Sequence, residues 1–292
     1  MIVSTALREK HRSPLYLIWL RFKANRAAIV SGVVLLTLIL MAIFAPLITI
    51  AGYDEQNFLD HGLEPPSAQF WFGVDDLGRD FFSRIVYGAR VSLTIGFASA
   101  FFAVLIGIPL GALAGYCGGW VDWFVMRVIE LFSVVPPLLA AMLLGALTKG
   151  GFATVVLIAS LFGWVQVCLL VRAQIKAFKE KEFVRAAVAL GASPAYVIHR
   201  HLLPNSISPI IVGFVLAIPL AMMLEAGLSF LGIGVQPPVP SWGQMINVGM
   251  NFMFFYWHMA VFPTVALAIT VLATTFFGDG LRDALDPTLK DR

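Results

Sequence analysis

Long apolar stretches without a charged residue constrain this chain more than any other feature. A transmembrane helix needs about 20 mostly apolar residues, and the sequence is 59% hydrophobic and 13% charged, against about 25% charged residues in soluble domains. We therefore expect an all-α integral membrane protein with about six transmembrane helices. The windows are residues 27–53, 91–121, 131–148, 150–171, 202–224 and 259–278. The third window can begin as early as Phe124, and the part of the fifth window that can span the membrane begins near Ile207.

Residues 227–258 are also apolar, but glycines and prolines interrupt them repeatedly. Irregular backbone at membrane depth must be buried in protein or line water. This segment is therefore expected to be re-entrant or interfacial rather than a seventh span.

The distribution of lysine and arginine along the chain predicts its orientation in the membrane. If the N-terminus lies inside, sixteen of the 20 lysines and arginines fall on inner segments. This is a positive-inside distribution, so both termini are expected to be cytoplasmic. The expected order is a cytoplasmic tail over residues 1–27, a first transmembrane helix over 28–50, an extracytoplasmic loop over 51–90, a five-helix core over 91–278 and a cytoplasmic tail over 279–292.

The extracytoplasmic loop is acidic at first and then becomes amphipathic in the stretch RDFFSRIVYGARVSL. Its apolar residues recur at helical spacing, which favours an interfacial elbow helix leading into the second span. These residues are Phe81, Phe82, Ile85, Val86 and Ala89.

Two catalytic patterns are weak in this sequence. Gly73 to Asp80 has the glycine spacing of a nucleotide-binding loop, but it lacks the lysine and hydroxyl that bind phosphate and magnesium. Ser229 lies in GLSFLG without completing a nucleophile elbow. An intramembrane serine protease using Ser229 and His258 stays a remote alternative, since small residues near a membrane serine usually serve packing.

The spans offer few ionisable groups for a proton relay. Arg127 and Glu130 are three residues apart and are expected to pair with each other. Glu225 is expected at the outer end of the fifth span, within reach of water. If the chain moves a solute, the energy is therefore expected to enter from outside the membrane, and a stand-alone secondary carrier is a further alternative.

The sequence contains no convincing metal site. Cys117 and Cys168 are expected to be small packed side chains. His199 and His201 are two residues apart, so on a helix they point in different directions.

The cytoplasmic stretch FVRAAVALGASPAYVIHRHLLPN predicts two short helices. Good helix formers run through Leu190, and Gly191 is expected to end that helix in a left-handed cap. Ser193 then offers an N-cap, with Pro194 at the first helical position. The second helix is expected over about 195–202, ending before Pro204.

This pair of helices favours docking to another protein over a plain basic loop. The small side chains of Ala186 and Ala187 allow a partner's groove to close over them, and Arg185 and Arg200 can meet acidic groups.

At these residues the chain resembles the permease subunits of ATP-binding-cassette importers. Their cytoplasmic pattern is Glu-Ala-Ala, three residues, Gly, nine residues, Ile-x-Leu-Pro. Ala186-Ala187, Gly191 and Leu203-Pro204 fall on that spacing, with Arg185 in place of Glu and His201 in place of Ile. The resemblance extends to the peptide and nickel branch, and most closely to the second permease of dipeptide or oligopeptide importers. It rests further on DDLGRDFFSRIVYGARVSL, AGYCGGWVDWFVMRV, GLSFLGIGVQPPVPSWGQMI and FFGDGLRDALDP.

The resemblance implies a type I, MetI-like permease fold in the bacterial inner membrane, without covalent chemistry in this chain. Residues 172–206 would be the coupling loop that docks to the ATPase. Its docking residues would be Arg185, Ala186, Ala187, Gly191, Ala192 and Ser193.

The implied partners are a paralogous permease, one or two ATPase subunits that bind ATP and magnesium, an extracytoplasmic substrate-binding protein and the lipid bilayer. Neither a cofactor or metal in this chain nor a nucleic acid is expected. The implied cargo is a di- or oligopeptide, with nickel, glutathione or another small solute as the alternative.

Overall fold

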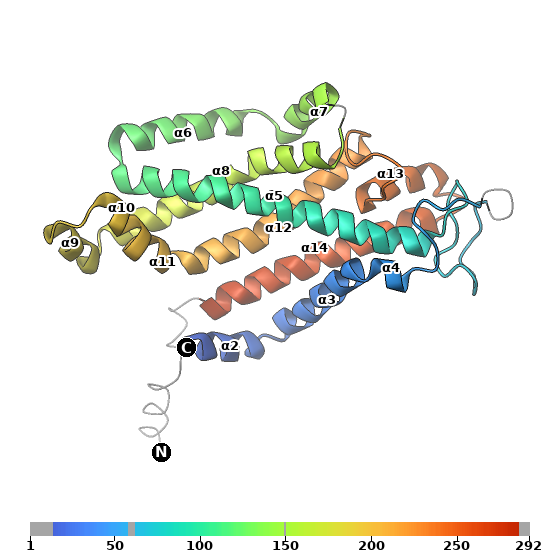
Figure 1. Ribbon diagram of the computed structural model, residues 1–292, viewed down its shortest axis with the longest axis horizontal. Helices are drawn as coiled ribbons and strands as arrows, with labels where there is room; N and C mark the ends of the chain where they lie inside the picture. Colours follow the sequence, from blue (N-terminus) through green and yellow to red (C-terminus); the bar gives the residue numbers. More distant parts are fainter. Residues whose placement is uncertain (1–13, 58–61, 149, 286–292) are drawn as a thin grey trace, which may run out of the picture.

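The structure is a computed structural model that describes residues 14–57, 62–148 and 150–285. Residues 1–13 and 286–292 of the two predicted tails, and Lys149, lie outside the described residues. The described part is predominantly α-helical (Figure 1). Its main helices are α2 (Pro14–Ala24), α3 (Arg26–Ile43), α4 (Ala45–Ile48), α5 (Phe81–Cys117), α6 (Gly119–Val134), α7 (Pro137–Thr148), α8 (Phe152–Lys179), α9 (Glu182–Ala189), α12 (Ile207–Phe230), α13 (Trp242–Phe252) and α14 (His258–Leu285).

Five helices of the described part are long and apolar enough to cross a membrane: α3, α5, α8, α12 and α14. A sixth span is present if α6 and α7 are counted as one broken crossing. This agrees with the expectation of about six transmembrane helices.

Helix α8 lies at the centre of the bundle and α3 at its periphery. In α8, 61% of the most apolar window is buried inside the protein, against 17% in α3. The contact between α5 and α8 is close because Gly107, Gly111 and Gly115 form a ridge on α5. A Cβ atom on Gly111 would lie 2.6 Å from the carbonyl oxygen of Cys168 on α8. Small residues allow membrane helices to approach in this way.

The two ends of the bundle are built differently (Figure 1). The short helices after α8 project at one end, where α2 and the last turns of α14 also lie. At this end the ring of Phe22 on α2 packs edge-on against Phe277 on α14, with centroids 5.4 Å apart. Helix α13 and the loop between α4 and α5 cover the opposite end.

The predicted elbow helix is not a separate interfacial element. Helix α5 runs without a break from Phe81 to Cys117, so it begins ten residues before the predicted second span. Phe81, Ile85, Val86 and Ala89 are buried inside the protein. The apolar face was correctly recognised, but it packs against neighbouring helices instead of lying at the membrane surface.

The predicted third span, residues 131–148, is not one continuous helix. Helices α6 and α7 meet at an angle of 83° across the break at Val135 and Pro136. Pro136 and Pro137 lack amide hydrogens, so they cannot continue the hydrogen bonding of α6. The apolar window is present, but consecutive prolines divide it.

The segment 227–258 does not form a seventh span. Helix α12 continues to Phe230, a loop follows, and α13 has only 11 residues, too few to cross a bilayer. Trp242 is fully buried, and its indole nitrogen donates a hydrogen bond to the carbonyl oxygen of Ile85, 3.0 Å away. The irregular backbone is thus packed against α5.

Candidate functional site

Gly191 ends α9 in a left-handed conformation, with φ of +86°. Its amide donates to the carbonyl oxygen of Val188 at 2.9 Å, and the amide of Ala192 donates to that of Ala187 at 3.1 Å. These are the two hydrogen bonds of a Schellman cap. The predicted helix end is therefore confirmed.

The second short helix begins as predicted but continues further. Ser193 caps α10 (Pro194–Val197) by accepting a hydrogen bond from the amide of Tyr196 at 3.3 Å. A π-helical turn, η1 (Ile198–Leu202), then leads into α11 (Leu203–Asn205). Pro204 lies in the first turn of α11, where a missing amide hydrogen is tolerated. The expected end before Pro204 is therefore wrong.

Apolar side chains attach the predicted coupling loop, residues 172–206, to the bundle. Val184, Val197 and Leu202 are buried in one cluster with Val171 and Ile175 of α8. This contact fixes the inner face of the loop and determines which residues face outward.

The outward face of the coupling loop forms a groove of about 700 Å³. Ala186, Ala187, Gly191, Ala192 and Ser193 line it. Its rim is apolar, since Leu190 is 89% exposed and Tyr196 is 53% exposed. Exposed apolar surface of this kind marks interaction sites.

Arg185 is the one predicted docking residue that does not line the groove. Its guanidinium donates to the carboxylate of Glu180 at 2.6 Å, and both side chains are exposed. This hydrogen bond lowers the pKa of Glu180 below its usual value. The pair lies beside the groove and adds charge next to an apolar surface.

A charged cluster supports the base of the coupling loop. Asp122 on α6 accepts hydrogen bonds from Arg172, at 2.8 Å from Nη2, and from Lys176, at 2.6 Å. Lys179 donates to the carbonyl oxygen of Tyr116 at 2.6 Å. The last turns of α8 are thereby tied to the turn between α5 and α6. Sequence reasoning missed Asp122, because its partner Arg172 is 50 residues away.

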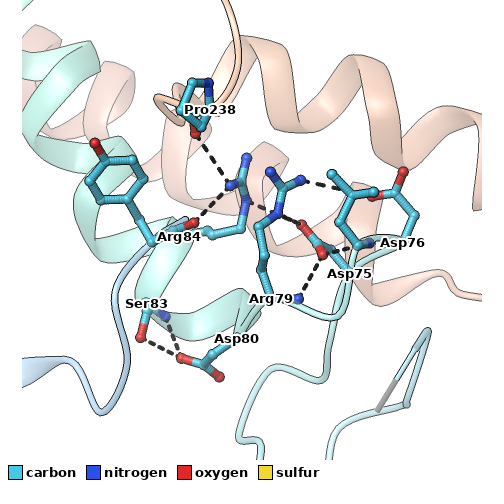
Figure 2. A network of polar contacts seen from close by, with 9 residues as sticks. Asp75, Asp76, Arg79, Asp80, Ser83, Arg84 and Pro238 are labelled. Carbon is cyan, nitrogen blue, oxygen red and sulfur yellow. Dashed lines mark hydrogen bonds and ion pairs between the residues drawn. The ribbon is translucent and has the colours of Figure 1, made fainter. Parts of the chain in front are cut away.

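The opposite end of the molecule carries a buried ion-pair network (Figure 2). Asp75 Oδ2 lies 2.7 Å from Nε of Arg79 and 3.3 Å from Nε of Arg84. Asp75 Oδ1 accepts hydrogen bonds from the amides of Leu77 and Arg79, both at 2.9 Å. One carboxylate thus pairs with two guanidinium groups and fixes the turn that precedes α5, and Asp76 Oδ1 lies 3.9 Å from Nη2 of Arg79.

Arg84 connects this network to two further segments. Its Nη1 donates to the carbonyl oxygen of Tyr53 at 2.9 Å and to that of Pro238 at 3.5 Å (Figure 2). Asp80 caps α5 by accepting a hydrogen bond from the amide of Ser83 at 2.8 Å. It therefore serves the helix and not a phosphate group.

Burial raises the pKa of Asp76, and the negative charge of the neighbouring Asp75 raises it further.

Glu225 does not reach water as predicted. It is fully buried, and it accepts hydrogen bonds from Ser229 at 2.7 Å and from Ser92 at 3.5 Å. Its position near the end of an apolar window could not reveal that α5 and α13 cover it. By contrast, Arg127 and Glu130 form the predicted pair, 2.6 Å apart and exposed.

Ser229 and His258 lie in different surroundings. The Ser229 hydroxyl donates to Glu225 and lies 3.5 Å from the hydroxyl of Ser241. His258 is buried among the rings of Phe81, Tyr256 and Trp257. Within the described residues no hydrogen bond joins Ser229 to His258, so the geometry gives no support to a catalytic pair.

The same arrangement of helices occurs in solved structures. Two inward-facing structures of the MetNI methionine ABC transporter share it, with TM-scores of 0.57 and 0.55 and sequence identities of 18% and 19%. The likeness covers 70% of this chain in both cases, and 96% and 97% of the two chains compared. The bundle is thus a MetI-like permease fold.

The chain belongs to the family of binding-protein-dependent transport system inner membrane components, whose model matches residues 107–291. The N-terminal TM domain of oligopeptide transport permease C matches residues 13–66.

Curated relatives match nearly the whole chain. The glutathione transport system permease protein GsiD of Pectobacterium atrosepticum is 40% identical over 97% of this chain and 95% of its own length. The oligopeptide permease OppC and the dipeptide permease DppC of Bacillus subtilis are each 40% identical over 93% of this chain, and over 88% and 85% of their own lengths.

Proposed function

We propose that this chain is a permease subunit of an ATP-driven importer that moves di- and oligopeptides delivered by a binding protein. The observation that carries the proposal is the 40% identity, over at least 93% of the chain, to permeases named for oligopeptides, dipeptides and glutathione. Glutathione is itself a tripeptide, so all three names describe peptide cargo. In this role the chain provides part of a pathway and performs no covalent chemistry.

The coupling loop would be the contact with the ATPase. Its groove combines small side chains, which allow close approach, with the exposed apolar side chains of Leu190 and Tyr196. Exposed apolar side chains at a protein surface become favourable contacts once a partner excludes water from them. ATP and magnesium would be bound by that partner, and a paralogous permease would complete the membrane unit.

The proposed function also predicts how the chain is oriented in the membrane. The coupling loop and both chain ends would face the cytoplasm, and the network around Asp75 would face the binding protein. Cys117 provides a test, because it is exposed at the coupling-loop end of α5 whereas Cys168 is buried. A membrane-impermeant maleimide should label Cys117 in opened vesicles but not in intact cells. Labelling in intact cells would reverse the orientation.

The function is tested by purification and reconstitution. The tagged chain, expressed with its genomic neighbours, should copurify with a second permease and an ATPase. Proteoliposomes holding the complex should accumulate a labelled dipeptide, tetrapeptide or glutathione only with the binding protein outside and ATP inside. A chain that purifies alone and transports without an ATPase would contradict the proposal and favour a secondary carrier.

A further inference from the structure

A cavity of about 500 Å³ lies between α5, α8 and α12. Its walls are apolar apart from two polar side chains among its lining residues, Ser99 on α5 and Gln166 on α8. None of the described residues that line it is charged. Two polar groups in an otherwise apolar wall require an explanation, because helices at this depth usually present only apolar groups.

Gln166 is exposed in the middle of a membrane helix. It lies six residues, about 9 Å along the helix axis, before Arg172. Within the described part of the chain its amide makes no hydrogen bond. An amide group carries two donor hydrogens and an acceptor oxygen, and leaving them unpaired in hydrocarbon costs several kcal/mol. This face of α8 therefore requires a polar neighbour.

Ser99 provides a second, independent observation. Its side chain is 1% exposed, and its hydroxyl is buried without a hydrogen-bond partner among the described residues. Its carbonyl oxygen, in contrast, accepts a hydrogen bond from the hydroxyl of Ser160 at 3.4 Å. A buried hydroxyl with no partner beside a cavity indicates a missing ligand or water.

The break between α6 and α7 reaches the same cavity, because Pro137 is one of its lining residues. Pro136 and Pro137 have no amide hydrogens, so the carbonyl oxygens of Phe132 and Ser133 have no donor four residues later. Broken helices in membrane transporters commonly surround a binding site. The two polar side chains, Ser99 and Gln166, thus line a cavity that is also bordered by the helix break at Pro137.

We propose that Gln166 and Ser99 form a polar subsite that hydrogen-bonds to the backbone of a peptide passing through this cavity. A peptide unit presents one N–H and one C=O, which the carboxamide of Gln166 can match as acceptor and donor. The apolar walls accept varied side chains by non-directional burial. A metal cation would lack carboxylate, thiolate or imidazole ligands here. This inference rests on the proposed function and assigns its cargo contact.

The test uses the complete complex in proteoliposomes. Gln166 is replaced by Cys in a chain carrying Cys117→Ser and Cys168→Ala. A small charged methanethiosulfonate reagent then modifies the new thiol, and the rate is followed on this chain by mass spectrometry, with and without transported dipeptide. The matched control is Leu157→Cys. Leu157 is also exposed and also on α8, but at 100° per residue it lies on the opposite face.

The expected result is modification of the Gln166→Cys chain that slows at least about fivefold during peptide transport, with no slowing at Leu157→Cys. A thiol that does not react, or one that reacts equally with and without peptide, would overturn the inference. Peptide uptake by the unmodified complex is measured in the same preparation. If that uptake is absent, the proposed function fails and the peptide assignment of the subsite fails with it.

A substitution series adds a second readout. Gln166→Leu should raise the KM for dipeptide uptake more than it lowers the maximum rate, and Gln166→Asn should recover part of the loss. Equal uptake by Gln166→Leu and the parent complex would also overturn the inference.

Discussion

The hydroxyl of Ser229 donates a hydrogen bond to the carboxylate of Glu225, 2.7 Å away and one helical turn earlier on α12. The same hydroxyl accepts a hydrogen bond from the amide of Val235 at 3.3 Å. Glu225 also accepts a hydrogen bond from the hydroxyl of Ser92 on α5. That hydroxyl in turn accepts a hydrogen bond from the amide of Trp242 at the start of α13. One buried carboxylate therefore connects α5, α12 and α13.

Glu225→Leu should lower the free energy of unfolding by about 2 kcal/mol, because the hydroxyls of Ser92 and Ser229 lose their acceptor. Glu225→Gln retains an acceptor oxygen and should remain within about 1 kcal/mol of the parent. Unfolding of both variants in mild detergent measures the difference. Equal stability of Glu225→Leu and the parent would show that this network does not hold the three helices together.

Gly191→Leu should weaken copurification of the ATPase at least about tenfold, since a side chain at the centre of a docking surface commonly costs more than 1.4 kcal/mol. It should not unfold the chain. Among the described residues, no atom beyond the immediate chain neighbours lies within 4 Å of a Cβ at this position, and the left-handed backbone costs about 1–2 kcal/mol.

The matched control for Gly191→Leu is Gly232→Leu. Gly232 also ends a helix with a positive φ, +78°, and open space around its Cβ. Its amide and that of Ile233 form the same pair of cap hydrogen bonds, but it does not line the groove. Similar loss of the ATPase from both variants would mean that backbone strain, not docking, is responsible.

Asp75→Asn should lower the free energy of unfolding by about 3 kcal/mol, because it leaves the buried guanidinium groups of Arg79 and Arg84 without their shared carboxylate. Thermal unfolding at neutral pH measures the loss. A stable Asp75→Asn variant that becomes less stable on Arg84→Gln would show that another acceptor replaces Asp75.

Asp76→Asn should have the opposite effect, although the two aspartates are adjacent. Burial and Asp75 raise the pKa of Asp76, so the folded state binds the proton more tightly than the unfolded state. The parent should therefore gain stability as the pH falls from the raised pKa towards 3.8, the ordinary value. Asp76→Asn should lose this gain, and at pH 7 it should be at least as stable as the parent. Unfolding temperatures between about pH 4 and pH 7 provide the measurement. A steeper acid dependence in the variant would refute the assignment.

Gly111→Ala should destabilise the bundle by about 1–3 kcal/mol through overpacking. Its Cβ would lie 2.6 Å from the carbonyl oxygen of Cys168 and 2.9 Å from Cβ of Val171. Gly227→Ala is the control, because the nearest atom to its Cβ is 3.9 Å away. Both variants are compared by unfolding in detergent, and equal stability would show that α5 and α8 can separate at no cost.

Local chemistry made much of this fold predictable. Apolar windows of membrane-spanning length located the long helices, and Gly191, Ser193 and Pro194 specified the caps of the coupling loop from their own backbone preferences. The docking role of that loop stays a prediction.

The remaining features depend on contacts between distant segments. Glu225 was expected near water because hydropathy cannot show which helices cover a residue, and the pairing of Asp122 with Arg172 depends on how α6 packs against α8. The break at Pro136 was missed because an apolar window measures composition and ignores hydrogen bonding.

Helix α5 reaches both polar clusters of this molecule. Arg84 ties its first turn to the network around Asp75, and at its other end the carbonyl oxygen of Tyr116 accepts a hydrogen bond from Lys179. Its 37 residues give a rod about 55 Å long, and a rotation of about 10° around its midpoint would displace each end by about 5 Å in opposite directions. When such a rod rotates about its midpoint without bending, a displacement of the cluster at one end is accompanied by an equal and opposite displacement of the cluster at the other end.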